Sequence, residues 1–234
     1  MTKQHFDSIV IGAGSAGLAF ATTAAGYGAR IALVELAELG GTCVNRGCVP
    51  KKILWAAGQM QRRVAGAAAR GITSDPVVDF AELVRARDKK IAQIRDSYQE
   101  KLADAGITLL RGAAEVGSET CVRVGEDHMT AHFIVLATGA KPAALDIDGS
   151  EHSSDSADVL SWEALPARMV IVGGGYIGCE FAAIFNAFGV EVTLVHDGAQ
   201  VLDAFDAPLA THVQAGLERT GVTVLTRDAV TQVT

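Results

Sequence analysis

The sequence contains the same short pattern twice: an apolar, β-branched run followed by glycines spaced G-x-G-x-x-G. The first copy joins Ile9, Val10 and Ile11 to GAGSAG, and the second joins VIV to GGGYIG about 160 residues later. Each run suits a buried parallel strand, and the Ala- and Phe-containing stretch after the glycines suits a helix. The repeat therefore predicts an α/β protein with two Rossmann-like nucleotide-binding domains.

In the first copy each glycine has a separate expected task. Gly12 allows the tight turn, Gly14 lets a pyrophosphate approach the backbone, and Gly17 lets the helix pack closely on the strand. The free N–H groups at the helix start then face the phosphates. Glu35 lies eighteen residues beyond Gly17, at the end of the strand IALV, where a carboxylate can accept hydrogen bonds from a ribose diol. All parts of a dinucleotide site are present.

The second copy places Gly173, Gly175 and Gly178 in the same register, and the same offset of eighteen residues leads to His196, followed by Asp197. A 2'-phosphate is usually bound by arginine, whereas a free 2'-hydroxyl is bound by a carboxylate.

The segment after the strand VTLV carries Asp197 and Asp203, and no Lys or Arg follows before Arg219. A 2'-phosphate would therefore meet acidic side chains, and the sequence favours NADH over NADPH.

The chain divides near residue 150, where a Gly-, Ser- and Asp-containing linker follows LATGAKP. We expect one domain over 1–150 and a second, incomplete one over 151–234. The predicted helices are 59–70 and 81–105, with a further helix starting around Pro50. The predicted strands are 107–111, 120–124 and 132–137 in the first domain and 190–195 and 222–226 in the second.

Two cysteines form the most specific feature of the chain. GGTCVNRGCVPKK places Cys43 and Cys48 five residues apart, close to Arg46, Lys51 and Lys52. These cations and a helix start near Cys48 predict lowered thiol pKa values. Structural zinc needs four ligands, and no second Cys or His pair follows at a suitable spacing. Two inert buried thiols remain an alternative, but a reactive pair explains the pattern better.

Several function classes are disfavoured by charge and composition. A net charge of −7 without a basic cluster argues against nucleic-acid and membrane-surface partners. The N-terminus has no signal-peptide pattern and no apolar run is long enough to span a bilayer, so a cytoplasmic protein is expected. The histidines form no recognisable constellation and no metal site is predicted; those outside the second glycine pattern are His5, His128, His132, His152 and His212.

With its flanking motifs, the cysteine segment resembles the flavoprotein disulfide reductases, and the resemblance covers essentially the whole chain. Within this family, PKK followed by ILWAA is most similar to glutathione reductases, because dihydrolipoamide dehydrogenases and mercuric reductases usually carry PSK. Tyr98 resembles the glutathione-site tyrosine. The resemblance implies FAD in the first domain, NAD(P)H in the second, a redox-active disulfide, a small disulfide substrate and a homodimeric complete enzyme.

The resemblance also implies a role for each catalytic residue. Tyr176 would swing aside so that reduced nicotinamide can pass hydride to the flavin. Cys48 would be the charge-transfer thiol beside the flavin, and Cys43 the interchange thiol that attacks the substrate. Lys51, paired with Glu180, would favour negative charge on the reduced flavin, and Lys52 is an alternative for this role.

The remaining matches are cofactor-binding positions of the family. With the residues named above, the implied FAD positions include Ser15, Ala16, Gly41, Thr42, Ala114, Thr138 and Gly139, and the implied dinucleotide positions include Gly174 and Ile177.

Two departures from the family pattern affect the interpretation. Gly178, Asp197 and Asp203 resemble NADH-linked glutathione amide reductases, although His196 stands where NADH enzymes usually carry Glu. Family members are also about twice this length, and their second half supplies a His-Glu acid-base pair. A fragment that binds FAD or a nucleotide without turnover is therefore an alternative, as is dihydrolipoamide dehydrogenase-like or mercuric reductase-like activity.

Overall fold

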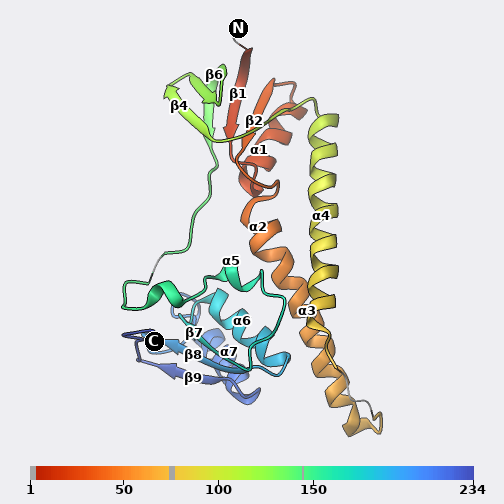
Figure 1. The fold of residues 1–234 in the computed structure, drawn as a ribbon, viewed down its shortest axis with the longest axis vertical. Helices are drawn as coiled ribbons and strands as arrows, with labels where there is room; N and C mark the ends of the chain where they lie inside the picture. The colour runs from red at the N-terminus through yellow and green to blue at the C-terminus, as the bar shows by residue number, and fades with distance from the viewer. Residues whose placement is uncertain (1–3, 74–76, 144) are drawn as a thin grey trace. The chain divides into compact units, whose positions relative to one another are not determined.

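The computed structural model describes residues 4–73, 77–143 and 145–234, and they form two compact units (Figure 1). Unit 1 comprises residues 1–50 and 87–141, and unit 2 comprises 51–86 and 142–234. The division falls within two helices, α3 (Cys48–Ala65) and α4 (Phe80–Asp104). Each unit therefore combines stretches of chain that are far apart in sequence.

Unit 1 is built on a six-stranded mixed sheet in the order β3-β2-β1-β6-β5-β4. Strands β3, β2, β1 and β6 are parallel, whereas β4, β5 and β6 pair in antiparallel fashion. The strands are β1 (Gln4–Ile11), β2 (Ile31–Glu35), β3 (Thr108–Arg111), β4 (Ala114–Ser118), β5 (Cys121–Val124) and β6 (Asp127–Leu136).

The two faces of the first sheet contribute to separate apolar clusters. One contains Val10 and Leu33 with Leu18 of α1 (Ser15–Gly26) and Leu102 of α4. The other joins Ile9 and Val34 to residues of β5 and β6. Because β1 and β2 are covered on both sides, they are apolar at successive positions, as buried parallel strands are. The α/β fold predicted from the glycine repeat is confirmed.

The antiparallel part of the sheet differs from the prediction. Strand β4 was not predicted, since AEVGS is short and partly polar, and it becomes a strand by pairing with β5 at the sheet edge. The strand predicted over 132–137 starts at Asp127, because its first residues pair with β5 across a tight turn.

The segment around the cysteines is helical: the helix expected to start around Pro50 is confirmed, whereas a short helix before it was not predicted. A short helix, α2 (Gly41–Arg46), is followed after Gly47 by α3, which runs without a break from Cys48 to Ala65. The helix predicted over 59–70 is thus the end of this longer helix plus a 3₁₀ turn, Gly66–Arg70. Pro50 is tolerated because it lies in the first turn, where its missing N–H is not required.

Unit 2 contains a three-stranded parallel sheet, β7-β8-β9, made of β7 (Arg168–Val172), β8 (Glu191–His196) and β9 (Thr223–Thr226). Helix α6 (Tyr176–Ala187) links β7 to β8, and α7 (Ala207–Arg219) links β8 to β9. Phe185 and Ile184 of α6 lie at the centre of its core with Leu194 of β8. Leu54 and Phe80 belong to the same core, so parts of α3 and α4 complete it. The unit also holds a 3₁₀ turn, Ser150–His152, and α5 (Ser156–Val159).

Candidate dinucleotide sites and thiol pair

The first glycine loop, Gly12–Gly17, connects β1 to α1 and has no room for a side chain at Gly12 or Gly17. Gly12 has φ +104°, and a Cβ there would lie 2.3 Å from the Ala137 carbonyl oxygen. A Cβ on Gly17 would lie 1.8 Å from the Gly12 oxygen. Gly14 caps α1 without any side-chain hydrogen bond, which leaves the N–H groups at the helix start open to an external acceptor. The loop therefore fits a pyrophosphate.

Glu35, at the end of β2, is held beside this loop. Its carboxylate accepts hydrogen bonds from the backbone N–H groups of Ala13, at 2.6 Å, and Ala37, at 2.8 Å. These bonds orient both carboxylate oxygens and leave lone pairs for a ribose diol. Arg111, which sequence reasoning missed, is the cross-strand partner of Glu35 and donates to the Ala37 carbonyl. The parallel register of β2 and β3 was the signal that could have revealed it.

Most other predicted residues of the first site surround the same loop. A Cβ on Gly41 would lie 2.6 Å from the Gly14 Cα, so the start of α2, with Thr42, lies against the loop. Ala137, next to Thr138 and Gly139, donates its N–H to the Ile11 carbonyl at 2.8 Å. Ser15 and Ala16 form the exposed first turn of α1. Ala114 opens β4, two residues after Gly112, whose N–H bonds the Glu35 carbonyl at 3.0 Å.

The two predicted redox cysteines are neighbours, and each lies near the start of a helix. Cys43 is in the first turn of α2 and half-buried, whereas Cys48 begins α3 and is exposed. Gly47 allows the close chain reversal between them, since a Cβ there would lie 3.0 Å from the Thr42 oxygen. Both cysteines are free thiols, and they lie close enough for Cys48 to shift the pKa of Cys43.

The pKa of Cys43 is raised above its ordinary value, mainly by the hydrogen bond with Cys48 and also by burial. The prediction of a lowered pKa is therefore wrong for Cys43 in the dithiol, because the neighbouring Cys48 side chain and burial both raise it. A hydrogen bond with the Ser15 side chain acts in the opposite direction and lowers the pKa. This contact joins the thiol pair to the first glycine loop, and no spacing in the sequence reveals it.

The second glycine loop, Gly173–Gly178, repeats the geometry of the first. Gly173 has φ +106°, Gly175 caps α6 without a side-chain hydrogen bond, and a Cβ on Gly178 would lie 2.0 Å from the Gly173 oxygen. Gly174 is buried against the His196 ring, and Ile177 is partly exposed on α6. The unit 2 loop thus fits a second pyrophosphate.

His196 lies at the end of β8 between two carboxylates. Its Nδ1 is 3.2 Å from Asp197 and its Nε2 is 3.6 Å from Asp203, and only 10% of the side chain is exposed. The buried Nε2 makes no hydrogen bond within the described part of the chain.

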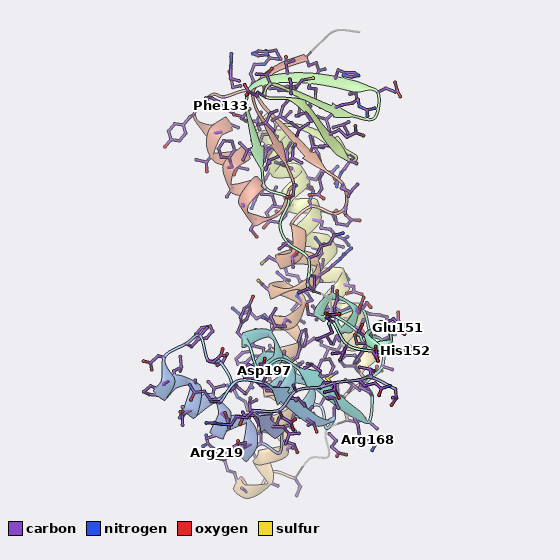
Figure 2. The ribbon with its side chains drawn as sticks, turned by 90° about the vertical axis from the view of Figure 1, so that its left-hand side faces the viewer. Phe133, Glu151, His152, Arg168, Asp197 and Arg219 are labelled. Atoms are coloured by element: carbon purple, nitrogen blue, oxygen red, sulfur yellow. The ribbon has the colours of Figure 1, made fainter. Side chains whose placement is uncertain are left out.

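Cations are placed unevenly around this second site. Arg219 ends α7, which runs back toward the N-terminal edge of the strands, and Figure 2 shows it apart from Asp197. Arg227, which sequence reasoning did not consider, follows β9, and its N–H donates to the Gly198 carbonyl at 2.8 Å. Its backbone therefore lies beside the loop that carries Asp197.

Three predicted catalytic residues meet within unit 2. Lys51, in the first turn of α3, forms an ion pair with Glu180 of α6, and 16% of the lysine side chain is exposed. The Lys51 Nζ lies 5.7 Å from the centre of the Tyr176 ring, a cation–π distance. Tyr176 is 57% exposed at the start of α6. Lys52 is exposed on α3, so the pairing favours Lys51 over the alternative.

Tyr98 is on α4 in unit 1 and packs partly against the core there. It also lines a hollow of about 290 Å³ on the helix surface. Two lysines at the rim make the hollow basic, and its lining residues are Lys90, Gln93, Ile94, Ser97, Tyr98 and Lys101.

The other two cysteines differ from the reactive pair. Cys179 is buried on α6 and its Sγ lies 3.4 Å from the Gly174 carbonyl. Burial, assisted by the charge of Glu180, raises the pKa of its thiol to about 11, which makes it a structural residue. Cys121 is half-buried on β5.

Comparison with known proteins shows which family and which relatives the chain is similar to. A family model described as pyridine nucleotide-disulphide oxidoreductase matches residues 6–234. The chain is 40% identical over 223 residues to a glutathione reductase of Burkholderia cepacia, covering 95% of this chain and 50% of that protein. It is 34% identical over 235 residues to a dihydrolipoyl dehydrogenase of Chlamydia pneumoniae, covering 98% and 51%. The chain thus spans about half the length of the curated relatives it matches.

Solved structures show the same likeness. The copper(II) complex of the HOCl-induced flavoprotein disulfide reductase RclA from Escherichia coli superposes with a TM-score of 0.85 at 29% identity, covering 100% of this chain and 51% of that one. Within residues 4–73, 77–143 and 145–234, no helix is both long enough and apolar enough to span a bilayer.

Proposed function

Since the chain belongs to the pyridine nucleotide-disulphide oxidoreductase family, we propose that it carries the cofactor sites and redox cysteines of an FAD-dependent disulfide reductase. The enzyme would pass electrons from NAD(P)H to a glutathione-type disulfide. The observation that carries this proposal is the pair of free thiols Cys43 and Cys48 at two adjacent helix starts, the first of which lies against a glycine loop shaped for a dinucleotide.

The two thiols can reduce a disulfide by two exchange steps. The Cys43 thiolate attacks one substrate sulfur, forms a mixed disulfide and releases the first thiol. The Cys48 sulfur then attacks Cys43, which releases the second thiol and leaves a Cys43–Cys48 disulfide. Bound FAD would supply the two electrons, taken from NAD(P)H, that return this disulfide to the dithiol.

Lys51, Glu180 and Tyr176 would act around the nicotinamide and flavin. Glu180 holds the Lys51 ammonium in place, and a positioned cation stabilises negative charge developing on a reduced cofactor. The exposed Tyr176 ring has room to move, as the resemblance requires for nicotinamide to enter.

The glutathione-type substrate is supported by Tyr98 and by the two lysines that share its hollow, because a substrate with carboxylates would find cations there. Dihydrolipoamide is the second candidate, and it is favoured by the similarity to dihydrolipoyl dehydrogenases.

We favour NADH as the electron donor, because Asp197 and Asp203 flank His196 where the adenine ribose would lie. A 2'-phosphate there would be repelled by two carboxylates. For the complete enzyme we propose a cytoplasmic homodimer whose second half supplies the His-Glu acid-base pair. The alternative is a chain that binds FAD and nucleotide without turnover.

The proposal is tested by titrating FAD-loaded protein anaerobically with NADH and following its visible absorbance. Partial reduction is expected to produce the long-wavelength absorbance of a thiolate beside oxidised flavin. Cys43→Ser should keep this absorbance and Cys48→Ser should lose it. Persistence of the absorbance in Cys48→Ser would contradict the assignment, and failure of the folded protein to bind FAD would contradict the reductase function itself. An FAD-loaded protein that shows the band but reduces no disulfide would favour the fragment alternative.

A further inference from the structure

Two histidines that are far apart in sequence meet on the surface of unit 1. His5 is on β1 and His132 is on β6, and both side chains are exposed. Their Nε2 atoms are 3.2 Å apart, and the rings are nearly perpendicular, with centroids 4.7 Å apart. The expectation that these histidines form no constellation is wrong, because the parallel pairing of β1 and β6 brings them together.

The distance between the two nitrogens matches that of two ligands on one metal ion. Zinc–imidazole bonds are about 2.0–2.1 Å long, so ligand angles between 90° and 109° separate two nitrogens by roughly 2.9–3.4 Å. The observed separation of 3.2 Å falls in this interval. The two strands therefore already hold the nitrogens at the separation that one ion requires.

A neighbouring hydroxyl sets the tautomer of one ring. The Nδ1 of His5 lies 3.0 Å from the Thr130 Oγ1, and Thr130 is the strand partner of His5. When Nδ1–H donates to this oxygen, Nε2 carries the free lone pair and faces His132. A hydrogen bond of this kind orients metal-binding histidines in many sites.

We propose that His5 and His132 form a surface site for a divalent transition-metal ion of the Zn²⁺, Ni²⁺ or Cu²⁺ class. Imidazole nitrogen suits these ions, whereas Mg²⁺ and Ca²⁺ take oxygen ligands. The described residues include no group of three or more His, Cys, Asp or Glu side chains arranged for a metal, so water fills the remaining positions.

The proposed site is separate from the dinucleotide site of unit 1. His5 is near the start of β1, whereas the first glycine loop follows its end, about 20 Å away along the strand. Phe133, next to His132 on β6, marks this part of unit 1 in Figure 2. A bound ion would link His5 of β1 to His132 of β6 and leave the first glycine loop free.

The test is calorimetric titration with Ni²⁺ of protein carrying Cys43→Ser and Cys48→Ser, which removes the competing thiols. We expect one ion per chain. His5→Gln and His132→Gln should each weaken binding by about 100-fold or more, because each removes one of two linked ligands. The matched control is His128→Gln, which changes another exposed histidine of β6 and should leave the affinity unchanged.

Three outcomes would overturn the proposal: no saturable Ni²⁺ binding in the parent, unchanged affinity in either His5→Gln or His132→Gln, or equal loss in His128→Gln. Far-ultraviolet circular dichroism of each variant establishes that it is folded. As a second measurement, Zn²⁺ should raise the unfolding temperature of the parent but not that of the His5→Gln and His132→Gln variants.

Discussion

At the scale of single residues, two neighbouring side chains shift the pKa of Cys43 in opposite directions. Cys48 raises the pKa of Cys43, and Ser15 lowers it. The thiolate is the reactive form, so the Ser15 hydroxyl keeps Cys43 more reactive than burial and its neighbouring sulfur would allow.

Ser15→Ala is therefore expected to raise the pKa of Cys43 further. In the reduced protein at pH 8, iodoacetamide should alkylate Cys43 about three- to tenfold more slowly, and the pH–rate profile should move to higher pH. Peptide mass spectrometry measures the rate for this cysteine alone. Thr22→Ala is the control, because the Thr22 hydroxyl donates to the carbonyls of Leu18 and Ala19 within the same helix, α1. An unchanged profile in Ser15→Ala would contradict the role of this hydrogen bond.

The proposed preference for NADH also depends on single side chains. Asp197 and Asp203 face His196 from either side, and the like charges disfavour a 2'-phosphate. We expect NADPH to bind about tenfold more weakly than NADH at low salt. The difference should shrink in the variant with both Asp197→Asn and Asp203→Asn, as measured by calorimetry.

Glu191→Gln is the matched control for this comparison, since Glu191 is exposed at the opposite end of β8. Arg227→Ala tests whether Arg227, whose backbone lies beside the loop that carries Asp197, contributes a cation to the site. Preference of the parent for NADPH, abolished by Arg227→Ala, would overturn the prediction for NADH.

At the scale of elements, each glycine loop holds a helix closely against a strand. The last glycine of each loop lies against the backbone of the first. A Cβ on Gly17 would be 1.8 Å from the Gly12 oxygen, and a Cβ on Gly178 would be 2.0 Å from the Gly173 oxygen. Because the opposing atom is a backbone oxygen, a side chain there forces the helix away from the strand.

Gly17→Ala is expected to lower the free energy of unfolding by about 1–3 kcal/mol, the usual cost of overpacking. Gly26→Ala, at the other end of α1, is the control, because no atom lies within 4 Å of its Cβ. It should be neutral or stabilise by up to about 1 kcal/mol through helix propensity. Urea denaturation of both variants measures the difference, and equal stability would contradict the packing argument.

At the scale of the whole molecule, each unit has its own apolar core and its own glycine loop. A ligand stabilises the folded state that binds it, so each cofactor should protect its own unit.

Hydrogen exchange measured by mass spectrometry tests this division. At a concentration 100 times its Kd, FAD should slow amide exchange about 100-fold in residues 12–18 and 40–46 where exchange requires unfolding of the bound unit. NADH should act on residues 173–179 and 196–203 instead. Protection by FAD confined to the second set would reverse the cofactor assignment.

Sequence alone determined the features that depend on local chemistry. Glycine spacing, strand runs and the acid after β2 predicted both nucleotide loops, because a close backbone approach permits only glycine at Gly12 and Gly17. The pair Cys43 and Cys48 could also be identified from the sequence, because both cysteines lie in one short segment at the start of α3.

Tertiary structure alone decided the contacts between residues distant in the chain. Ser15 meets Cys43, Arg111 meets Glu35, and His5 meets His132 through helix docking and strand register. The assignment of residues 51–86 to unit 2 likewise depends on Leu54 and Phe80 entering the core around α6. Such contacts are set by the packing of whole elements, and no local pattern encodes which side chains that packing will bring together.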